Sequence, residues 1–311
     1  MSWRGRCGLV LGVLLALAAP SLAPAQDDGP RVYQLAPVGA KTLTAFSVVK
    51  DSNETFESDQ VVSGSRFASN VVVLRYAQTF DLWGRQFNPF VILPVGGVRQ
   101  VTAGPGGIAG GASSGLGDMQ IGAVFGLIGS PALAPADYAD YRPFVTSGLL
   151  ARVFFPTGAY NAAETVNLGA NRFAYQFGAP TTFMFGQSYA SPTLTALEVL
   201  PTVTFYGPNT APPGATRVTR APLFSLESHL TRNLGSTVWV SADLLYRSGG
   251  ATTTDDIPDE NPTRGWSAGV TGALKVRGQA SIILTWEHVV SRSDNGPDGW
   301  FFRTALVVPF R

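Results

Sequence analysis

The chain has 311 residues, and its 22 Lys and Arg residues nearly balance its 21 Asp and Glu residues, for a formal net charge of +1. Charged residues make up only 14% of the chain, whereas soluble globular domains carry about 25%. Hydrophobic residues, at 45%, exclude a disordered chain. The near-neutral charge offers no general attraction to nucleic acid, so none is expected as a partner.

The N-terminal residues have the three parts of a secretory signal. Arg4 and Arg6 precede an apolar run over residues 9–19, and small residues end at Ala25, where we predict cleavage. The run is too short for a membrane-spanning helix, which needs about 20 residues. Cys7 is the one cysteine, so the exported part of the chain is expected to be free of cysteine.

Beyond residue 38, apolar residues alternate with polar ones at period two and almost nowhere recur at helical spacing. From Met119 to Leu127 every odd position is apolar, which predicts a strand with two unlike faces. Clear alternation recurs at residues 172–185, 197–205, 224–231, 238–247, 266–276 and 300–310. Weaker candidate strands lie at about residues 39–50, 67–80, 86–98, 142–155 and 279–290.

These segments number about twelve, and each apolar face runs over about ten residues, the length of a tilted strand crossing an outer membrane. The connections alternate between long ones, such as residues 51–66 and 249–264, and short ones, such as residues 232–235. We therefore predict an all-β fold: an antiparallel transmembrane β-barrel of about twelve strands, with short periplasmic turns and long extracellular loops. The connection over residues 129–140 is long where a short turn is expected and is interpreted as an insertion.

A soluble secreted sandwich or barrel is the alternative for such a chain, but it would normally carry more charge than 14%. We expect instead a protein of the bacterial outer membrane, in contact with its lipids and lipopolysaccharide. Side chains expected to face lipid include Phe177, Val199, Val240 and Leu306. The expected organisation is a cleaved signal peptide over residues 1–25, an N-terminal extension over residues 26–38, and the barrel over residues 39–311. No plug of useful size is expected within the extension.

Four short, mostly Gly-rich stretches resemble a known family. They are residues 114–123 (SGLGDMQIGA), 155–161 (FPTGAYN), 167–172 (NLGANR) and 246–250 (YRSGG). They are similar to outer-membrane transporters labelled "phenol meta-pathway degradation protein", and the similarity runs from about residue 39 to the end. The resemblance implies a barrel associated with uptake of aromatic or other hydrophobic compounds. It implies no catalytic or ligand-binding residue.

If the apolar positions face lipid, residues of the opposite parity line the lumen. The lumen-lining candidates are Arg75, Asp118, Arg152, Glu198, Glu227, His229, Trp239, Asp243, Arg247, Lys275, Glu287 and Arg303. Five of them are basic and five acidic, with His229 neutral, and this balance does not favour an ion-selective pore. Two interpretations stay open: the charges pair across strands and fill a narrow barrel, or they form a polar constriction that a small solute passes.

Candidates for chemistry are weak. Residues 111–115 match the G-x-S-x-G pattern but lead into a strand, whereas a nucleophile elbow needs a strand-to-helix turn. His229 and His288 are the two histidines, and neither has the Ser two residues along that outer-membrane phospholipases use. We expect no enzyme activity, cofactor or metal, and His288 at an interfacial position. The acidic loops over residues 255–260 and 294–298 lack EF-hand spacing and are expected to be solvated, with binding of divalent cations as the alternative.

The sequence therefore predicts an outer-membrane channel or facilitator for passive uptake of small, largely hydrophobic or aromatic solutes. The main alternative is a non-transporting closed barrel that serves as a surface scaffold or adhesion element. An outer-membrane hydrolase is less favoured, because it needs a Ser-His pair within hydrogen-bond reach. The solute, the direction of transport and the oligomeric state are not specified by the sequence.

Overall fold

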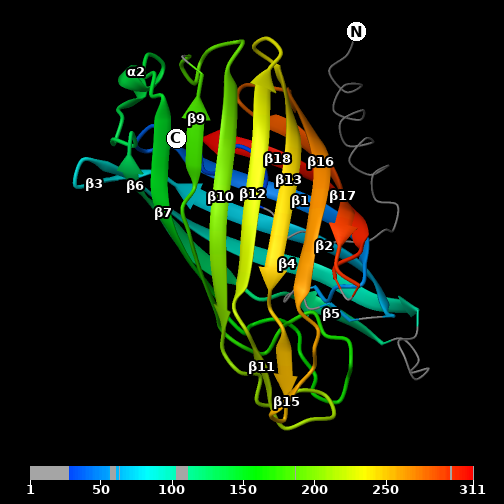
Figure 1. The fold of residues 1–311 in the computed structure, drawn as a ribbon. Coiled ribbons are helices and arrows are strands. Elements are labelled where there is room, and N and C mark those ends of the chain that lie inside the picture. Colours follow the sequence, from blue (N-terminus) through cyan, green and yellow to red (C-terminus); the bar gives the residue numbers. More distant parts are fainter. Residues whose placement is uncertain are drawn as a thin grey trace, which may run out of the picture.

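The computed structural model describes residues 28–56, 61–62, 64–102, 111–185, 187–294 and 296–310. The predicted signal peptide lies outside these residues. Within them, twelve long strands form one closed antiparallel barrel (Figure 1). In chain order they are β1 (Lys41–Ser52), β2 (Arg66–Gln78), β4 (Arg85–Thr102), β5 with β6 (Ala112–Leu116, Gln120–Ile128), β7 (Val145–Phe154), β8 with β9 (Ala174–Gly178, Thr181–Met184), β10 (Thr195–Tyr206), β12 (Leu223–Asn233), β13 (Val238–Gly249), β16 (Thr263–Lys275), β17 (Ser281–Arg292) and β18 (Gly299–Phe310).

The barrel closes through pairing of the first and last strands. β1 and β18 are in register along their whole length, from Lys41 opposite Phe310 to Ser52 opposite Gly299. Short connections gather at the end where β1 begins and β18 finishes, here named the turn end, and long connections gather at the opposite loop end (Figure 1). β3 (Phe80–Leu82) extends the hairpin between β2 and β4 at the turn end. The predicted fold class is confirmed.

The outer surface of the wall is apolar. Exposed side chains on it include Leu43, Leu74, Ile121, Leu149, Phe177, Val240, Val270, Trp286 and Val308. Phe177 and Val240 are exposed, and Val199 and Leu306 are partly exposed, so none of these four side chains lies in a protein core. A closed barrel with an apolar exterior is the form that crosses an outer membrane, because closure satisfies every backbone group. No described helix is long and apolar enough to span a membrane.

The interior has two unlike halves. The inner face of β10, β12, β13, β16 and β17 is mostly polar, as the alternation predicts. The inner face of β1, β2, β4, β6 and β7 instead carries buried Val48, Val71, Phe90, Val124 and Leu150, which form one apolar cluster. The expectation of a polar lumen was wrong for this half. Strands such as β2 carry apolar residues on both faces, so their alternation does not reveal which face is inside.

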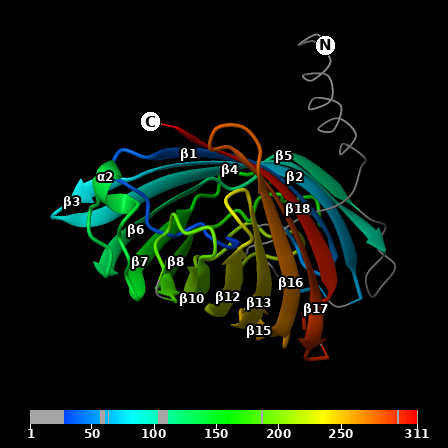
Figure 2. The same ribbon diagram turned by 90° about the horizontal axis from the view of Figure 1, so that it is seen from above.

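Residues 28–38, here named the strap, run inside the ring of strands (Figure 2). Side chains of the wall satisfy the strap's backbone: the amides of Asp28, Arg31 and Ala36 donate to carboxylate or amide oxygens of β4, β10 and β12 at 2.7–3.1 Å. The expectation that this extension contains no plug was wrong, because even a short segment is held in the lumen when several distant strands supply its partners.

The long connection between β6 and β7 has a structural role at the turn end. It contains the short helix α2 (Pro135–Tyr138), whose Tyr138 hydroxyl donates to the Leu35 carbonyl at 2.9 Å. The Val38 amide donates to the Leu133 carbonyl at 2.8 Å. The Tyr138 ring stacks on the ring of Tyr189, in the connection between β9 and β10, with the ring centroids 5.3 Å apart. The segment interpreted as an insertion therefore holds the strap where it enters the barrel.

The loop end is covered by folded connections. The segment between β7 and β8 turns inward, and its Val166 and Leu168 are buried in the apolar cluster. β11 (Val218–Arg220), β14 (Thr252–Thr254) and β15 (Ile257–Pro258) form a separate three-stranded sheet beyond the barrel wall (Figure 1). Asp118 lies between β5 and β6, where its carboxylate accepts the amides of Gly158 and Ala170 at 2.8 and 2.9 Å.

Candidate functional site

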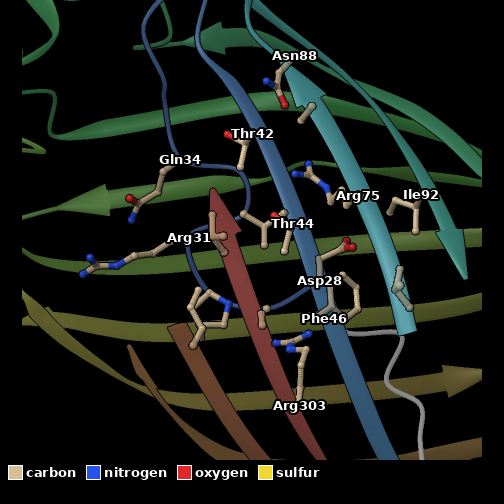
Figure 3. Close-up of a pocket in the computed structure, with 18 of the residues that line it drawn as sticks. Asp28, Arg31, Gln34, Thr42, Thr44, Phe46, Arg75, Asn88, Ile92 and Arg303 are labelled. Carbon is tan, nitrogen blue, oxygen red and sulfur yellow. The ribbon is translucent and has the colours of Figure 1, made fainter. Parts of the chain in front are cut away.

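A cavity of about 390 Å³ lies between the strap and the inner faces of β1, β2, β4 and β18 (Figure 3). Its volume falls within the range of small-molecule pockets, roughly 300–1,000 Å³. The wall is apolar along Phe46, Val73 and Ile92, and Thr44 and Asn88 add polar groups. The cavity therefore offers an apolar surface with a few directed hydrogen-bonding groups.

Four guanidinium groups and one carboxylate line this cavity: Arg31, Arg75, Arg152, Arg303 and Asp28. Arg152 Nη2 donates to Asp28 Oδ2 at 2.5 Å, and Tyr33 Oη donates to the same oxygen at 2.8 Å. Burial opposes ionisation of Asp28, but Arg152, the Tyr33 hydroxyl and the Arg75 charge together outweigh burial and hold the pKa of Asp28 below its ordinary value. Asp28, the one carboxylate described at this cavity, therefore already accepts hydrogen bonds from Arg152 and Tyr33.

The opposite side of the strap faces acidic groups on β10, β12 and β13. Glu198 accepts the Arg31 amide at 2.7 Å and the Gln34 side-chain amide at 2.9 Å. His229 Nδ1 lies 2.8 Å from Asp243 Oδ1, and its Nε2 lies 3.6 Å from a Glu227 oxygen. Side chains of neighbouring strands are therefore joined here, with His229 between Glu227 and Asp243.

The strap packs closely against the wall at two further points. Gly29 has a φ of +84°, and a Cβ at this position would collide with the Arg303 guanidinium. Arg31 lies over the Trp239 ring at 4.4 Å and donates from Nη1 to Asn233 Oδ1 at 2.8 Å. The positive φ favours glycine at position 29, and a larger residue would also displace the Arg303 guanidinium.

A second ionic group lies nearer the loop end. Arg247 Nη2 contacts Glu54 Oε1 at 2.9 Å, and Lys50 pairs with the same carboxylate. Glu287 and Arg247 line a much smaller cavity of about 30 Å³ beside this group. Its size leaves room for about one water molecule, which does not suit a solute.

The structure places the predicted lumen residues in several separate regions of the barrel. Arg75, Arg152, Trp239 and Arg303 line the main cavity, while Glu198, Glu227, His229 and Asp243 form the acidic half. Arg247 and Glu287 belong to the group near the loop end. Asp118 anchors a loop, and Lys275 is exposed at the turn end of β16. Contact of any of these residues with a solute stays a prediction.

Sequence reasoning missed the strap residues Asp28, Arg31, Tyr33 and Gln34. The one available signal in the sequence was the unexpected length of the connection over residues 129–140, which indicates that this connection packs against another segment. The cavity's apolar wall, with Phe46, was also missed because alternation was assigned to a polar lumen throughout.

The residues considered for catalysis lie in strands of the barrel. Residues 112–116 form β5 rather than a strand-to-helix turn, and Ser113 Oγ accepts the Leu168 amide at 3.1 Å. His288 is exposed on the outer face beside Trp286, and its interfacial position stays a prediction. Within the described ranges, no group of three or more His, Cys, Asp or Glu side chains is placed to hold a metal ion.

A family model described as "Putative MetA-pathway of phenol degradation" matches residues 50–303. The chain belongs to this family. The match to the phenol-degradation family runs from the end of β1 into β18, so it covers nearly the whole barrel. No curated protein matches the chain.

Solved structures of similar fold include two outer-membrane proteins. The COG4313 outer membrane channel from Pseudomonas putida F1 is 19% identical with a TM-score of 0.74, covering 91% of this chain and all (100%) of that one. The β domain of the Bordetella autotransporter BrkA is 11% identical with a TM-score of 0.52, covering 88% of this chain and 100% of that one. These likenesses concern the fold, and with the apolar exterior they confirm the expected localisation in the outer membrane.

Proposed function

We propose that this member of the phenol-degradation family is an outer-membrane channel for passive uptake of small, largely hydrophobic or aromatic solutes. The observation that carries the proposal is the cavity of about 390 Å³ inside the barrel, with Phe46, Val73 and Ile92 along its wall. An apolar solute that leaves water for such a wall gains about 25 cal/mol for each Å² of apolar surface removed from water. Thr44 and, at another level of the cavity, Asn88 are the polar groups that can bind a hydroxyl.

Two comparisons support the proposal. The family description refers to phenol degradation, and the similar Pseudomonas putida protein is described as an outer membrane channel. The proposal contains no catalytic step and no cofactor. Outer-membrane lipids and lipopolysaccharide are its proposed surroundings.

The strap sets the route that a solute takes. It lies between the cavity and the acidic half. Gln34 and Ala36 each bind the wall through one hydrogen bond, whereas Asp28 and Arg31 bind it through several contacts. A single hydrogen bond contributes about 0.5–1.5 kcal/mol net, so displacement of the part of the strap around Gln34 and Ala36 is within reach of thermal motion. We propose that a solute crosses when the strap moves aside from the cavity.

Swelling of liposomes that contain the protein tests the channel with phenol as the solute. We expect faster swelling than in protein-free liposomes, and no difference would overturn the proposal. The double variant Ala36→Cys/Gln86→Cys adds a control, because the Ala36 amide lies 3.0 Å from Gln86 Oε1 and the exported chain is expected to be free of cysteine. A short bifunctional thiol reagent should fix the strap and slow phenol entry, with the single variant Ala36→Cys unaffected.

The closed, non-transporting barrel is the second candidate. The same strap, together with the buried Val166 and Leu168 of the inward-turning loop, favours it because both obstruct the lumen. Absence of phenol flux, with the cross-linked and free proteins behaving alike, would support this candidate instead.

A further inference from the structure

The main cavity carries an unequal set of charges. Five acidic and five basic residues were expected to share the lumen, but most of the acidic ones lie on the far side of the strap or near the loop end. Among the described residues that line the cavity, Arg31, Arg75, Arg152 and Arg303 carry guanidinium groups and Asp28 carries a carboxylate, while Glu198 on the far side of the strap accepts the Arg31 amide. Acidic and basic residues are nearly equal in number over the whole sequence, but basic residues outnumber acidic ones around this cavity.

Arg75 is a guanidinium group of this cavity whose donors are only partly used. Its Nε and Nη2 atoms are shielded from solvent, and neither has a hydrogen-bond partner among the described residues. The nearby Asp28 oxygen is already occupied by Arg152 and Tyr33. Burying a cation without a hydrogen-bonded partner is costly, so an anion that reaches Arg75 gains a strong interaction.

The surroundings of Arg75 select the kind of anion. Its guanidinium lies over the Phe90 ring at 4.8 Å, so one face of the group is covered, and the Arg75 side chain lines the cavity with its remaining surface. Thr44 is directly opposite Arg75 on β1 and adds a hydroxyl at the same level. Phe46 is the next inward residue on β1, and the Arg303 guanidinium lies 6.0 Å from its ring (Figure 3).

We infer that this cavity binds a small monocarboxylate with an apolar body, its carboxylate paired with Arg75 and its body against Phe46, Val73 and Ile92. A carboxylate matches the two parallel N–H donors of a guanidinium edge, and the apolar wall favours an aromatic or short aliphatic group over a bare inorganic anion. This inference names a solute class and rests on the proposed channel for its biological use.

Binding of benzoate to the purified full-length protein in detergent tests the inference without requiring transport. Isothermal titration calorimetry should give a dissociation constant for benzoate that rises at least tenfold in Arg75→Gln. The matched control Arg277→Gln changes the same residue type at an exposed turn and should leave the constant unchanged. Benzamide, which has the same ring but no charge, should bind the unmodified protein and the Arg75→Gln variant weakly and to the same extent.

Three results would overturn the inference: no benzoate binding by the unmodified protein, equal binding by Arg75→Gln, or displacement of benzoate by sulfate as readily as by hexanoate. Circular dichroism and the change in gel mobility on heating check that each variant has folded. Phenol flux in liposomes is measured separately. Binding without flux would overturn the channel and keep the site, whereas flux without binding would overturn the site and keep the channel.

Discussion

Arg152 joins the strap to the wall of the barrel through a buried ion pair. Its guanidinium binds the Asp28 carboxylate and the Tyr33 hydroxyl, at 2.5 and 2.6 Å. Substitution Arg152→Gln leaves the carboxylate buried without this partner, and breaking such a pair costs about 3–5 kcal/mol. We expect the strap to separate from the wall more often, seen as faster hydrogen exchange at the Arg31 amide.

The double variant Asp28→Asn/Arg152→Gln is the control for this prediction. It removes both charges, so we expect slower exchange at the Arg31 amide than in Arg152→Gln alone. Equal exchange in the two variants would mean that the pair has no part in holding the strap.

Asp255 lies at the loop end, and the hydrogen bonds to its carboxylate depend on pH. The Thr216 hydroxyl and the Thr216 and Arg217 amides donate to its carboxylate, and these hydrogen bonds hold the pKa of Asp255 below its ordinary value. The stabilisation is therefore fully present above the ordinary carboxyl pKa of about 3.9, and it is lost as the pH falls through the lowered pKa.

We expect exchange protection of the Thr216 and Arg217 amides, corrected for the intrinsic rate, to fall at this acidic pH. Asp255→Asn should remove the pH dependence, and Asp256→Asn in the same turn should retain it. An unchanged pH profile in Asp255→Asn would contradict the assignment.

The strap illustrates what sequence patterns leave out at the scale of an element. Strands follow from alternation, which is a local property, and the expected segment at residues 238–247 agrees with β13. The strap has no period, and its contacts join residues as distant as Asp28 and Glu227, which are 199 positions apart. Only the closed barrel brings such partners together, so neither the strap nor the cavity beside it is visible before the fold is known.

Deleting residues 28–36 tests the strap as an element. We expect a larger single-channel conductance in planar bilayers, because the segment no longer occupies the lumen. We also expect a lower melting temperature, since Glu198 loses the Arg31 amide and the Gln34 side chain as partners.

Adding Glu198→Gln to the deletion provides the control, because a neutral amide is less costly to leave without those partners. The melting temperature should partly recover while the conductance stays high. Unchanged conductance after deletion would show that the strap does not limit the pore.

At the scale of the whole molecule, the apolar exterior is what the sequence predicted best. Low charge and period-two alternation indicated it, and exposed Phe177 and Val240 confirm it. The division of the interior into an apolar and a polar half was not predictable, because Val71, Val72 and Leu74 give β2 two apolar faces. Parity separates the faces of a strand only where their chemistry differs.

Leu149 lies near the middle of β7 and is 52% exposed on the outer surface. Leu149→Arg should lower the free energy of unfolding in lipid vesicles by about 2–4 kcal/mol, the cost of a lipid-facing arginine near the bilayer midplane. Ile257→Arg, at an exposed position of β15 beyond the wall, should change it little. Guanidinium-chloride titration of both variants checks this, and equal stabilities would contradict the assigned membrane region.

The strap leads directly into β1, the strand whose pairing with β18 closes the wall. A fusion partner joined ahead of Asp28 would therefore begin within the enclosure, where a folded domain has no room. An affinity handle or a fluorescent reporter is therefore not to be joined directly ahead of Asp28.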